Sequence, residues 1–440
     1  MGACAEPSEG VGRVLGVFWA LPFVCVTVTR AQNGAADPVL DWARSHVFTV
    51  SSVEPGSPST DLQPFKRLIG DARVIAFGEP DHGIHEFQSF RNRLFQFLVE
   101  EMGVTAIAAE TGYSESVAVD DYVNGKGELT PAIVGSVFSW SAGTPYADNR
   151  ALIDWIRSYN ARPSTKRKIH FYGLDLTGGR GGRFTQTRLA VDAALAYVAA
   201  VDSVQARALS ARIMPSMPRF ISGSYDSLTI TDQNALTAAI DDLVGLFERR
   251  QAKWSAKTSP GAYDRAYHEA IVVRQLNANF RAASGESNPQ AQREIAMAQN
   301  LRWVLEREGP QSRVLVFAAN WHVSKGPMTS DRWGTSLGEH LHSIFGKDFV
   351  SIAGAYYRGE STGASDELSA PDSGSVAAMM SRLSERRVVL PLGDVPNSGP
   401  VADWFRSSRA VEAGRIDSMT VNDAFNAVVF IATVHPASTQ

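Results

Sequence analysis

The sequence predicts an α/β protein with a mostly parallel sheet flanked by helices and a large helical insertion capping the carboxyl edge of the sheet. Two observations favour this class. Short apolar runs with strand character recur along the chain between helical segments, and residues 186–309 show helical spacing with no convincing strand. With 440 residues, 44% of them apolar and 20% charged, the chain has the composition of a globular protein with a substantial core.

Residues 74–110 predict a βαβ unit at the centre of the sheet. Residues 74–77 and 105–109 are apolar runs of strand-forming residues. The helix expected between them has an apolar stripe at three- and four-residue spacing, formed by Phe87, Phe90, Leu94 and Leu98. A strand, a helix and a second strand in so short a stretch predict two parallel neighbouring strands.

Titratable side chains follow both strands of this unit. Glu79 and His82 stand in the loop after the first strand, and Glu110 stands at the end of the second. Because open α/β sheets place their sites at the carboxyl ends of parallel strands, we expect these three side chains to converge. This edge is the predicted active centre.

Two arginines of the same helix receive different predictions. Arg91 falls on the apolar stripe, whereas Arg93 points away from it. A buried guanidinium needs anionic partners, and the nearest are Glu79 and Glu110. The alternative is that the stem of Arg91 reaches along the apolar surface to bring its charge to water. We predict that Arg91→Ala destabilises the protein and that Arg93→Ala is nearly silent.

The remaining elements follow in order. A helix around residues 152–156 is followed by a strand at 168–173 that delivers Asp175 at its end. The glycine-rich, basic loop at 177–183 could cradle an anion, but it lacks the context of a P-loop, so we interpret it as a flexible rim. After the insertion, further strands are expected at residues 314–318, 349–353, 387–390 and 427–431.

The insertion brings two more candidates. In its last helix Arg293 and Asn300 are seven residues apart, beside an apolar stripe. Such a pair faces either a cleft or solvent. We expect Asn300, with Asp175, to contact substrate.

The N-terminal residues predict an exported protein. Residues 14–28 are an uncharged apolar run, too short to span a bilayer comfortably, which favours a signal peptide at 1–31 and a mature domain at 32–440. The alternative is a non-functional extension and a cytoplasmic protein. Both cysteines, Cys4 and Cys25, lie in this leader, so the mature domain would hold no disulfide and no thiol nucleophile. Val24 before Cys25 argues against a lipid anchor.

The charge of the chain excludes one class of partner. A net charge of −4 and a pI near 6.2 provide no basic field for nucleic acid. The expected partner is a small-molecule substrate, without a stable membrane anchor.

Four residues at three strand ends carry the predicted chemistry: Glu79, His82, Glu110 and His322. Two mechanisms fit them. A carboxylate can orient one histidine, which deprotonates a water for attack on a carbonyl. Alternatively, the four side chains bind a divalent metal that acidifies the water. The sequence does not decide between these mechanisms.

A serine hydrolase is a weaker alternative. Ser336 lies in a match to G-x-S-x-G at residues 334–338. The motif requires a preceding strand, whereas residues 325–333 have the composition of a loop. We interpret the match as chance.

Several further motifs occur together in this chain: Gly78-Glu79-x-x-His82-Gly83-x-x-Glu86-Phe87, then Arg91 and Glu110, Trp155-x-Arg157-x-Tyr159-Asn160, Tyr172-Gly173-x-Asp175, and Arg293-Glu294-x-x-Met297-Ala298-x-Asn300. In combination, over residues 71–437, they resemble the erythromycin esterase family. The resemblance implies a hydrolase that opens a macrolactone ester by attack of water, without a required cofactor. It implies that His82 is the general base, supported by Glu79, Arg91, Glu110 and Arg293.

One position departs from the family pattern. Residues 317–322 read Phe-Ala-Ala-Asn-Trp-His, where the family typically has a histidine in place of Ala319. Alanine cannot bind a proton or a metal, so either His322 suffices or this member has weakened chemistry. The preferred function is hydrolysis of an ester or lactone in a fairly large, partly apolar substrate. The alternatives are a binding protein that keeps the cleft but not turnover, and a metal-dependent hydrolase acting on another bond.

Overall fold

The computed structural model describes residues 37–130, 133–134, 137, 146–176, 184–220, 224–327, 334–362, 368–411 and 419–439. The predicted leader and the glycine-rich loop at 177–183 lie outside these residues. None of the described helices is long and apolar enough to cross a membrane.

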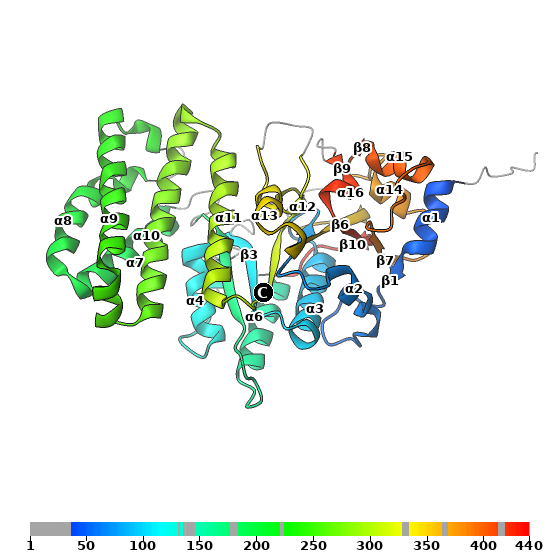
Figure 1. Ribbon diagram of the computed structural model, residues 1–440, viewed down its shortest axis with the longest axis horizontal. Helices are drawn as coiled ribbons and strands as arrows, with labels where there is room; N and C mark the ends of the chain where they lie inside the picture. The colour runs from blue at the N-terminus through cyan, green and yellow to red at the C-terminus, as the bar shows by residue number, and fades with distance from the viewer. Residues whose placement is uncertain are drawn as a thin grey trace, which may run out of the picture. The chain divides into compact units, whose positions relative to one another are not determined.

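An eight-stranded sheet forms the centre of the protein, with the order β1-β7-β10-β6-β2-β5-β3-β4 (Figure 1). The six strands from β10 to β4 are parallel, and β7 runs antiparallel to both of its neighbours. The strands of this sheet are β1 (Phe48–Thr49), β2 (Val74–Glu79), β3 (Ala106–Gly112), β4 (His170–Asp175), β5 (Val314–Ala319), β6 (Phe349–Gly359), β7 (Arg387–Pro391) and β10 (Ala427–Val434). The predicted α/β class and every predicted strand are confirmed. The short strand β1 and the separate pair β8 (Ser408–Arg409) and β9 (Met419–Thr420) were not predicted.

Helices cover both faces of the sheet because each central strand alternates its side chains between two apolar cores. In β2, Val74 and Ala76 enter one core, while Ile75 and Phe77 enter the other. The first core is completed by α1 (Pro38–His46), α11 (Pro289–Glu308), α13 (Leu337–Phe345), α14 (Val376–Met380), α15 (Pro400–Arg406) and α16 (Val421–Ala424). The second is completed by α2 (Pro64–Ile69), α3 (His85–Met102), α4 (Tyr113–Val123) and α6 (Ala147–Asn160).

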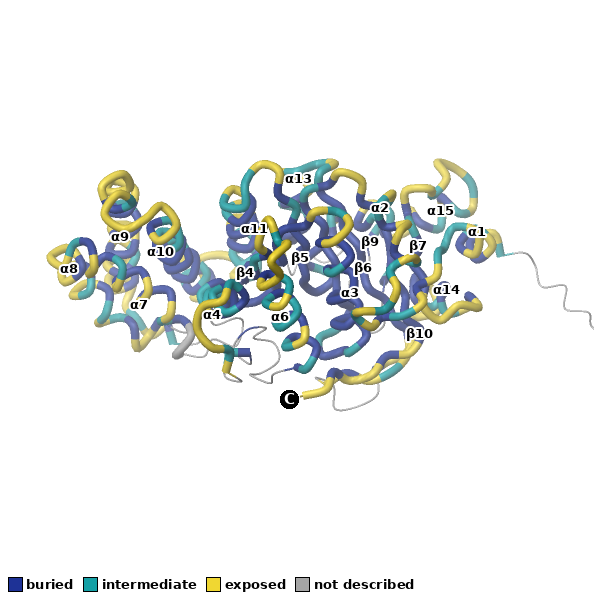
Figure 2. Tube along the Cα trace, turned by 90° about the horizontal axis from the view of Figure 1, so that it is seen from below, coloured by how far each residue is buried: buried dark blue, intermediate teal, exposed yellow. Residues whose placement is uncertain are grey.

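The predicted helical insertion begins with α7 and ends with α11, close to the expected bounds of residues 186–309. The helices before α11 are α7 (Phe184–Val201), α8 (Ser203–Ile213), α9 (Ile230–Lys257) and α10 (Pro260–Arg281). These four build most of a third core beside the β4 end of the sheet, to which Tyr113 of α4 and Ala296 of α11 also contribute (Figures 1 and 2). The insertion reaches the carboxyl ends of the strands through α11, which packs on β4 and carries Arg293.

Candidate active site

Glu79 and His82 form a hydrogen-bonded pair where β2 ends. The Nδ1 atom of His82 lies 2.7 Å from Oε1 of Glu79. Glu79 is fully buried, whereas the His82 side chain is 32% exposed. A carboxylate can only accept this hydrogen bond, so the proton of the neutral ring resides on Nδ1 and Nε2 carries the lone pair. The ring is therefore oriented by a buried carboxylate and accessible from solvent.

The loop that carries His82 is fixed to distant parts of the chain. Gly83 has a left-handed φ of 74°, which glycine tolerates. Its carbonyl accepts hydrogen bonds from the backbone N–H groups of Thr362 (3.0 Å) and Ala437 (2.8 Å). Because both partners lie beyond the ends of strands β6 and β10, the sheet itself holds the loop in place.

A second cluster joins the ends of β3, β4 and β5 through Arg293 of α11. The Arg293 guanidinium donates to Asp175 at 2.9 and 2.6 Å and to Oε1 of Glu110 at 2.7 Å. Glu110 also contacts Nε2 of His322 at 3.0 Å and accepts the backbone N–H of Ala319 at 2.9 Å. His322 lies in α12 (Asn320–Val323), directly after β5.

Both ring nitrogens of His322 are used inside the protein. Nδ1 lies 2.8 Å from Oε2 of Glu294, and Nε2 lies 3.0 Å from Oε1 of Glu110 and 3.2 Å from Nη1 of Arg293. A ring that donates to two carboxylates is an imidazolium. Burial lowers the pKa of His322, and so does the charge of Arg293, but Glu110 and Glu294 outweigh both and raise the pKa to about 9.

The two clusters also act on each other electrostatically. Burial lowers the pKa of His82, but the hydrogen bond and the charge of Glu79, with a contribution from Glu110, raise it above its usual value. Burial raises the pKa of Glu79, and the hydrogen bond from His82 offsets part of the rise. Burial would raise the pKa of Glu110, yet His322 and Arg293 hold it well below its usual range. Glu79, His82, Glu110, Asp175, Arg293 and His322 thus belong to one charged assembly at the carboxyl edge.

The two arginines of α3 are both buried, although the sequence places only Arg91 on the apolar stripe. Arg91 is fully buried, as expected, with its guanidinium 4.6 Å from the centre of the Phe317 ring. It donates to the side chain of the adjacent Asn92 at 3.0 and 2.8 Å. Glu79 and Asp148 act on it through their charges, but neither outweighs burial, which lowers the pKa of Arg91 to about 10.

Arg93 points away from the apolar stripe but is buried as well, which argues against the prediction that Arg93→Ala is nearly silent. Its guanidinium contacts Asp61 at 2.6 Å and the carbonyl oxygen of Ser52 at 2.6 Å. The loop before α2 covers this side of α3. Arg93→Ala should therefore destabilise the protein.

Two candidate substrate-binding residues have partners within the protein. The Asn300 amide donates to the Leu174 carbonyl at 2.7 Å and accepts from Gln275 at 3.1 Å. Both carboxylate oxygens of Asp175 bind Arg293. These contacts favour a positioning role over the substrate contact that the sequence predicts.

Glu294 is the site residue that sequence reasoning missed. It is fully buried, holds Nδ1 of His322 and accepts the backbone N–H of Leu337 at 2.9 Å. The available signal was its place beside Arg293 in the motif on α11. A carboxylate next to a functional arginine and inside a buried helical stripe requires a cationic partner.

Ser336 has a structural role. Its hydroxyl donates to the Ser324 carbonyl and accepts from the backbone N–H of Glu339, which makes Ser336 the N-cap of α13 in a complete capping box. The residue is 1% exposed. The interpretation of the G-x-S-x-G match as chance agrees with these contacts.

The alternative metal site does not fit the donors that are present. In the parts of the chain that the structure describes, no group of three or more His, Cys, Asp or Glu side chains could hold a metal ion. Within the predicted set, both ring nitrogens of His322 already contact groups of the protein. Assay with a chelator tests metal dependence directly.

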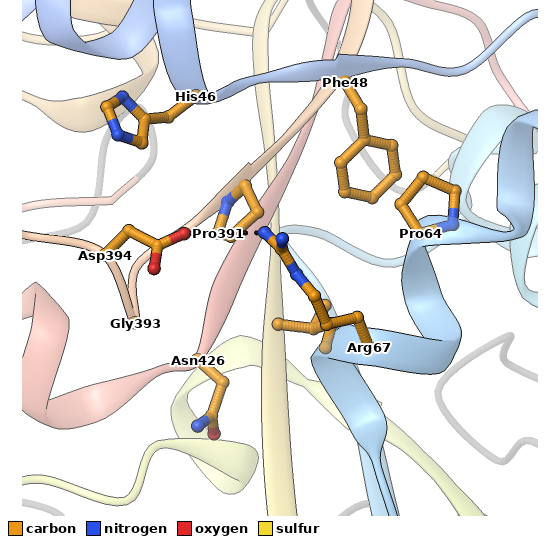
Figure 3. Close-up of a pocket in the computed structure, with 9 residues that line it drawn as sticks. His46, Phe48, Pro64, Arg67, Pro391, Gly393, Asp394 and Asn426 are labelled. Carbon is orange, nitrogen blue, oxygen red and sulfur yellow. Dashed lines mark ion pairs between the residues drawn. The ribbon is translucent and has the colours of Figure 1, made fainter.

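A cavity of about 610 Å³ lies at the opposite edge of the sheet (Figure 3). Its walls include His46, Phe48 and Pro64, and Arg67 and Asp394 form an ion pair of 3.6 Å in it. Pro391, at the end of the antiparallel strand β7, and Asn426, just before β10, place this cavity at the amino edge. It shares no residue with the charged assembly.

Comparison with known proteins identifies the family. A family model described as erythromycin esterase matches residues 99–434. The chain therefore belongs to the erythromycin esterase family, as the motifs predicted. An erythromycin esterase type II of Escherichia coli is 24% identical over 72% of this chain and 77% of its own length. A putative hydrolase, YbfO, of Bacillus subtilis is 21% identical over 90% of this chain and 91% of its own.

Solved structures share the fold at low sequence identity. A protein from Bacillus cereus aligns with a TM-score of 0.74 and 23% identity over 91% of this chain and 98% of its own. A succinoglycan biosynthesis protein gives 0.76 with 20% identity over the same shares. An erythromycin esterase mutant in its open conformation gives 0.66 with 15% identity over 89% of this chain and 98% of its own. These structures support the fold. The reaction depends on the residues of the site.

Proposed function

We propose that this protein hydrolyses an ester or lactone in a fairly large, partly apolar substrate, with His82 as the general base. The observation that carries the proposal is the Glu79–His82 hydrogen bond of 2.7 Å behind a ring that is 32% exposed. The family and the esterase and hydrolase relatives favour the same class of reaction. A macrolide lactone is the first substrate to test, because a relative bears the name erythromycin esterase.

In the proposed mechanism, Nε2 of His82 takes a proton from a water as that water attacks the substrate carbonyl. Glu79 holds the ring in the required tautomer and stabilises the imidazolium that forms. The imidazolium then returns the proton to the departing alkoxide. Arg293, Glu110, Asp175 and His322 provide a fixed charged wall, which needs no rearrangement during the reaction.

The discriminating experiment is a panel of macrolides, simple lactones and aryl esters assayed with and without a chelator. We expect turnover of at least one ester, unaffected by the chelator and lowered by about 10²–10⁴ in His82→Asn. Loss of activity with chelator would instead support the metal-dependent hydrolase. Binding of an ester by calorimetry without any turnover would support a binding protein.

Ala319 is the residue that supports the alternative of a binding protein without turnover. Replacing it provides a separate test of that alternative. Ala319 is buried and pairs with Glu79 in the β2–β5 register, so a side chain there stands beside that carboxylate. If a histidine at this position helps to polarise the carbonyl or to place the water, its loss costs about 10²–10³ in rate. Ala319→His should then raise kcat by about that factor while substrate affinity changes much less. No gain on any ester that binds would count against a slow esterase.

A further inference from the structure

A second pocket of about 510 Å³ lies beside the loop that carries His82, on the side of strand β10. Its lining is unusually basic. Arg358 comes from the end of β6, Arg386 and Arg387 from the start of β7, and His85 from the first turn of α3. None of these groups takes part in the proposed hydrolysis.

The sheet register brings the arginines to one place. Arg358 pairs with Thr433 of β10, and Arg387 pairs with Ile431 two residues earlier on the same strand. Ile431 and Thr433 also line the pocket, and Thr433 is exposed there. Side chains two residues apart on a strand lie on the same face. Guanidinium groups from two strands therefore flank one hydroxyl.

The arginines keep donors for a ligand. Arg387 is held in place by the carbonyl oxygens of Val50 (3.3 Å) and Ser51 (2.8 Å) through Nε and Nη2, which leaves Nη1 to a ligand. The side chains of Arg358 and Arg386 are exposed and have no hydrogen bond or ion pair to any described residue. A guanidinium offers five N–H donors in a planar fork that matches the oxygens of a phosphate.

The charges of the lining are not balanced within the pocket. Glu54 and Glu86 are its carboxylates. Glu54 contacts His85 at 3.1 Å, and Glu86 contacts His435 at 2.5 Å. His85 is itself held cationic, because Asp148 and Glu54 raise its pKa to about 9 against the effect of burial. The three arginines remain without carboxylate partners among the described residues. The N-terminus of α3 adds a partial positive charge.

We propose that this pocket binds a phosphate-type oxyanion, either as the free ion or as the phosphate group of a monoester. Such a group carries about two negative charges near neutral pH. Thr433 and the forks of Arg358, Arg386 and Arg387 supply its donors. A monocarboxylate would leave a large part of the positive charge unpaired. The proposal does not depend on the hydrolytic activity.

Backbone hydrogen bonds connect this pocket to the loop that carries His82. The carbonyl oxygen of His435 accepts the backbone N–H of His85 at 2.9 Å, and the backbone N–H of Ala437 donates to the Gly83 carbonyl at 2.8 Å. The segment that follows β10 therefore forms both a wall of the pocket and a support of the loop. An anion that orders this segment also stabilises the fold around His82.

The test is calorimetric titration with inorganic phosphate, glycerol phosphate and malonate at constant ionic strength. The key variant is Arg358→Gln with Arg386→Gln. Its matched control is Arg44→Gln with Arg302→Gln, which removes the same charge from exposed sites elsewhere. We expect saturable binding of a phosphate species to the wild type, weakened about tenfold or more in the key variant and little changed in the control. Tighter binding of glycerol phosphate than of phosphate would assign the site to a phosphorylated molecule, and the reverse order would assign it to the free ion.

Three outcomes would overturn the proposal. They are the absence of saturable binding of either phosphate species, preference for malonate, and equal weakening in both double variants. Because all four substituted arginines are exposed, each variant should fold, and this is checked by its unfolding midpoint. A phosphate-induced rise in that midpoint, lost only in the key variant, is the independent readout.

Discussion

His82 and His322 each bind a buried carboxylate, and the two pairs lie in one charged assembly, yet their surroundings differ. His82 contacts Glu79 through Nδ1 and keeps 32% of its side chain exposed. His322 is 1% exposed, and carboxylates hold both of its ring nitrogens. The first ring can exchange a proton with a bound molecule. The second is a fixed cation that ties α11, α12 and the end of β3 together. A histidine at a strand end is therefore a candidate base only if one ring nitrogen faces the substrate.

The largest expected effect tests His82 directly. His82→Asn removes the proton acceptor and should lower kcat by about 10²–10⁴. The unfolding midpoint should change little, because the ring is partly exposed. His342→Asn, an exposed histidine on α13, is the control. Retained activity in a folded His82→Asn protein would remove His82 from its role.

The next effect concerns stability. His322→Gln leaves Glu110 and Glu294 without their shared cation, and breaking such a buried pair costs about 3–5 kcal/mol. The raised pKa of about 9 means that the contribution of His322 is fully present below its usual pKa of 6.5 and is lost as the pH rises through 9. The difference in denaturant midpoint between wild type and variant should therefore shrink from pH 6 to pH 9.5.

A double variant separates this explanation from a simple loss of packing. Adding Glu294→Gln to His322→Gln removes an uncompensated buried charge. Part of the stability should return, as a positive coupling in a double-mutant cycle. Additive losses would show that the pair contributes nothing beyond its separate contacts.

The strand ends could be predicted from the sequence because the strands and α3 have local apolar patterns. Those patterns alone are enough to place Glu79, His82 and Glu110 at one edge of the sheet. The contacts that distinguish the two histidines are not local. Glu294 meets His322 across 28 residues, and Glu110 meets it across 212. No periodicity within one element reports such a pairing.

Arg93 also shows that the pattern within one helix does not report contacts with distant segments. A helical wheel describes the faces of α3 but not the segments that cover them, and residues 52–61 cover the face that points away from the apolar stripe. Asn300 was predicted to contact substrate, whereas its amide binds the Leu174 carbonyl. A wheel identifies the line on which a side chain lies. The neighbouring element decides what the side chain contacts.

A smaller effect compares the two arginines of α3. Arg91→Ala and Arg93→Ala each leave buried acceptors without a donor, so each should lower the free energy of unfolding by about 1–3 kcal/mol. Of these two arginines, Arg91 is the one whose charge lowers the pKa of Glu79. Activity per folded molecule should therefore change in Arg91→Ala and remain close to wild type in Arg93→Ala. A silent Arg93→Ala would show that its contacts with Asp61 and Ser52 contribute nothing measurable.

The smallest effect is a shift in a pH profile. A general base must be neutral, so kcat/KM should fall as the pH drops through the pKa of His82, which lies above its usual 6.5. The Glu79 carboxylate is the main cause of that raised value. Glu79→Gln removes the charge and should move the acidic limb of the profile to lower pH, even though the variant is slower. An unmoved limb would assign the titration to another group of the assembly. A limb that moves to lower pH in Glu79→Gln would identify His82 as the group that exchanges the proton. It would exclude His322, because both of its ring nitrogens contact carboxylates.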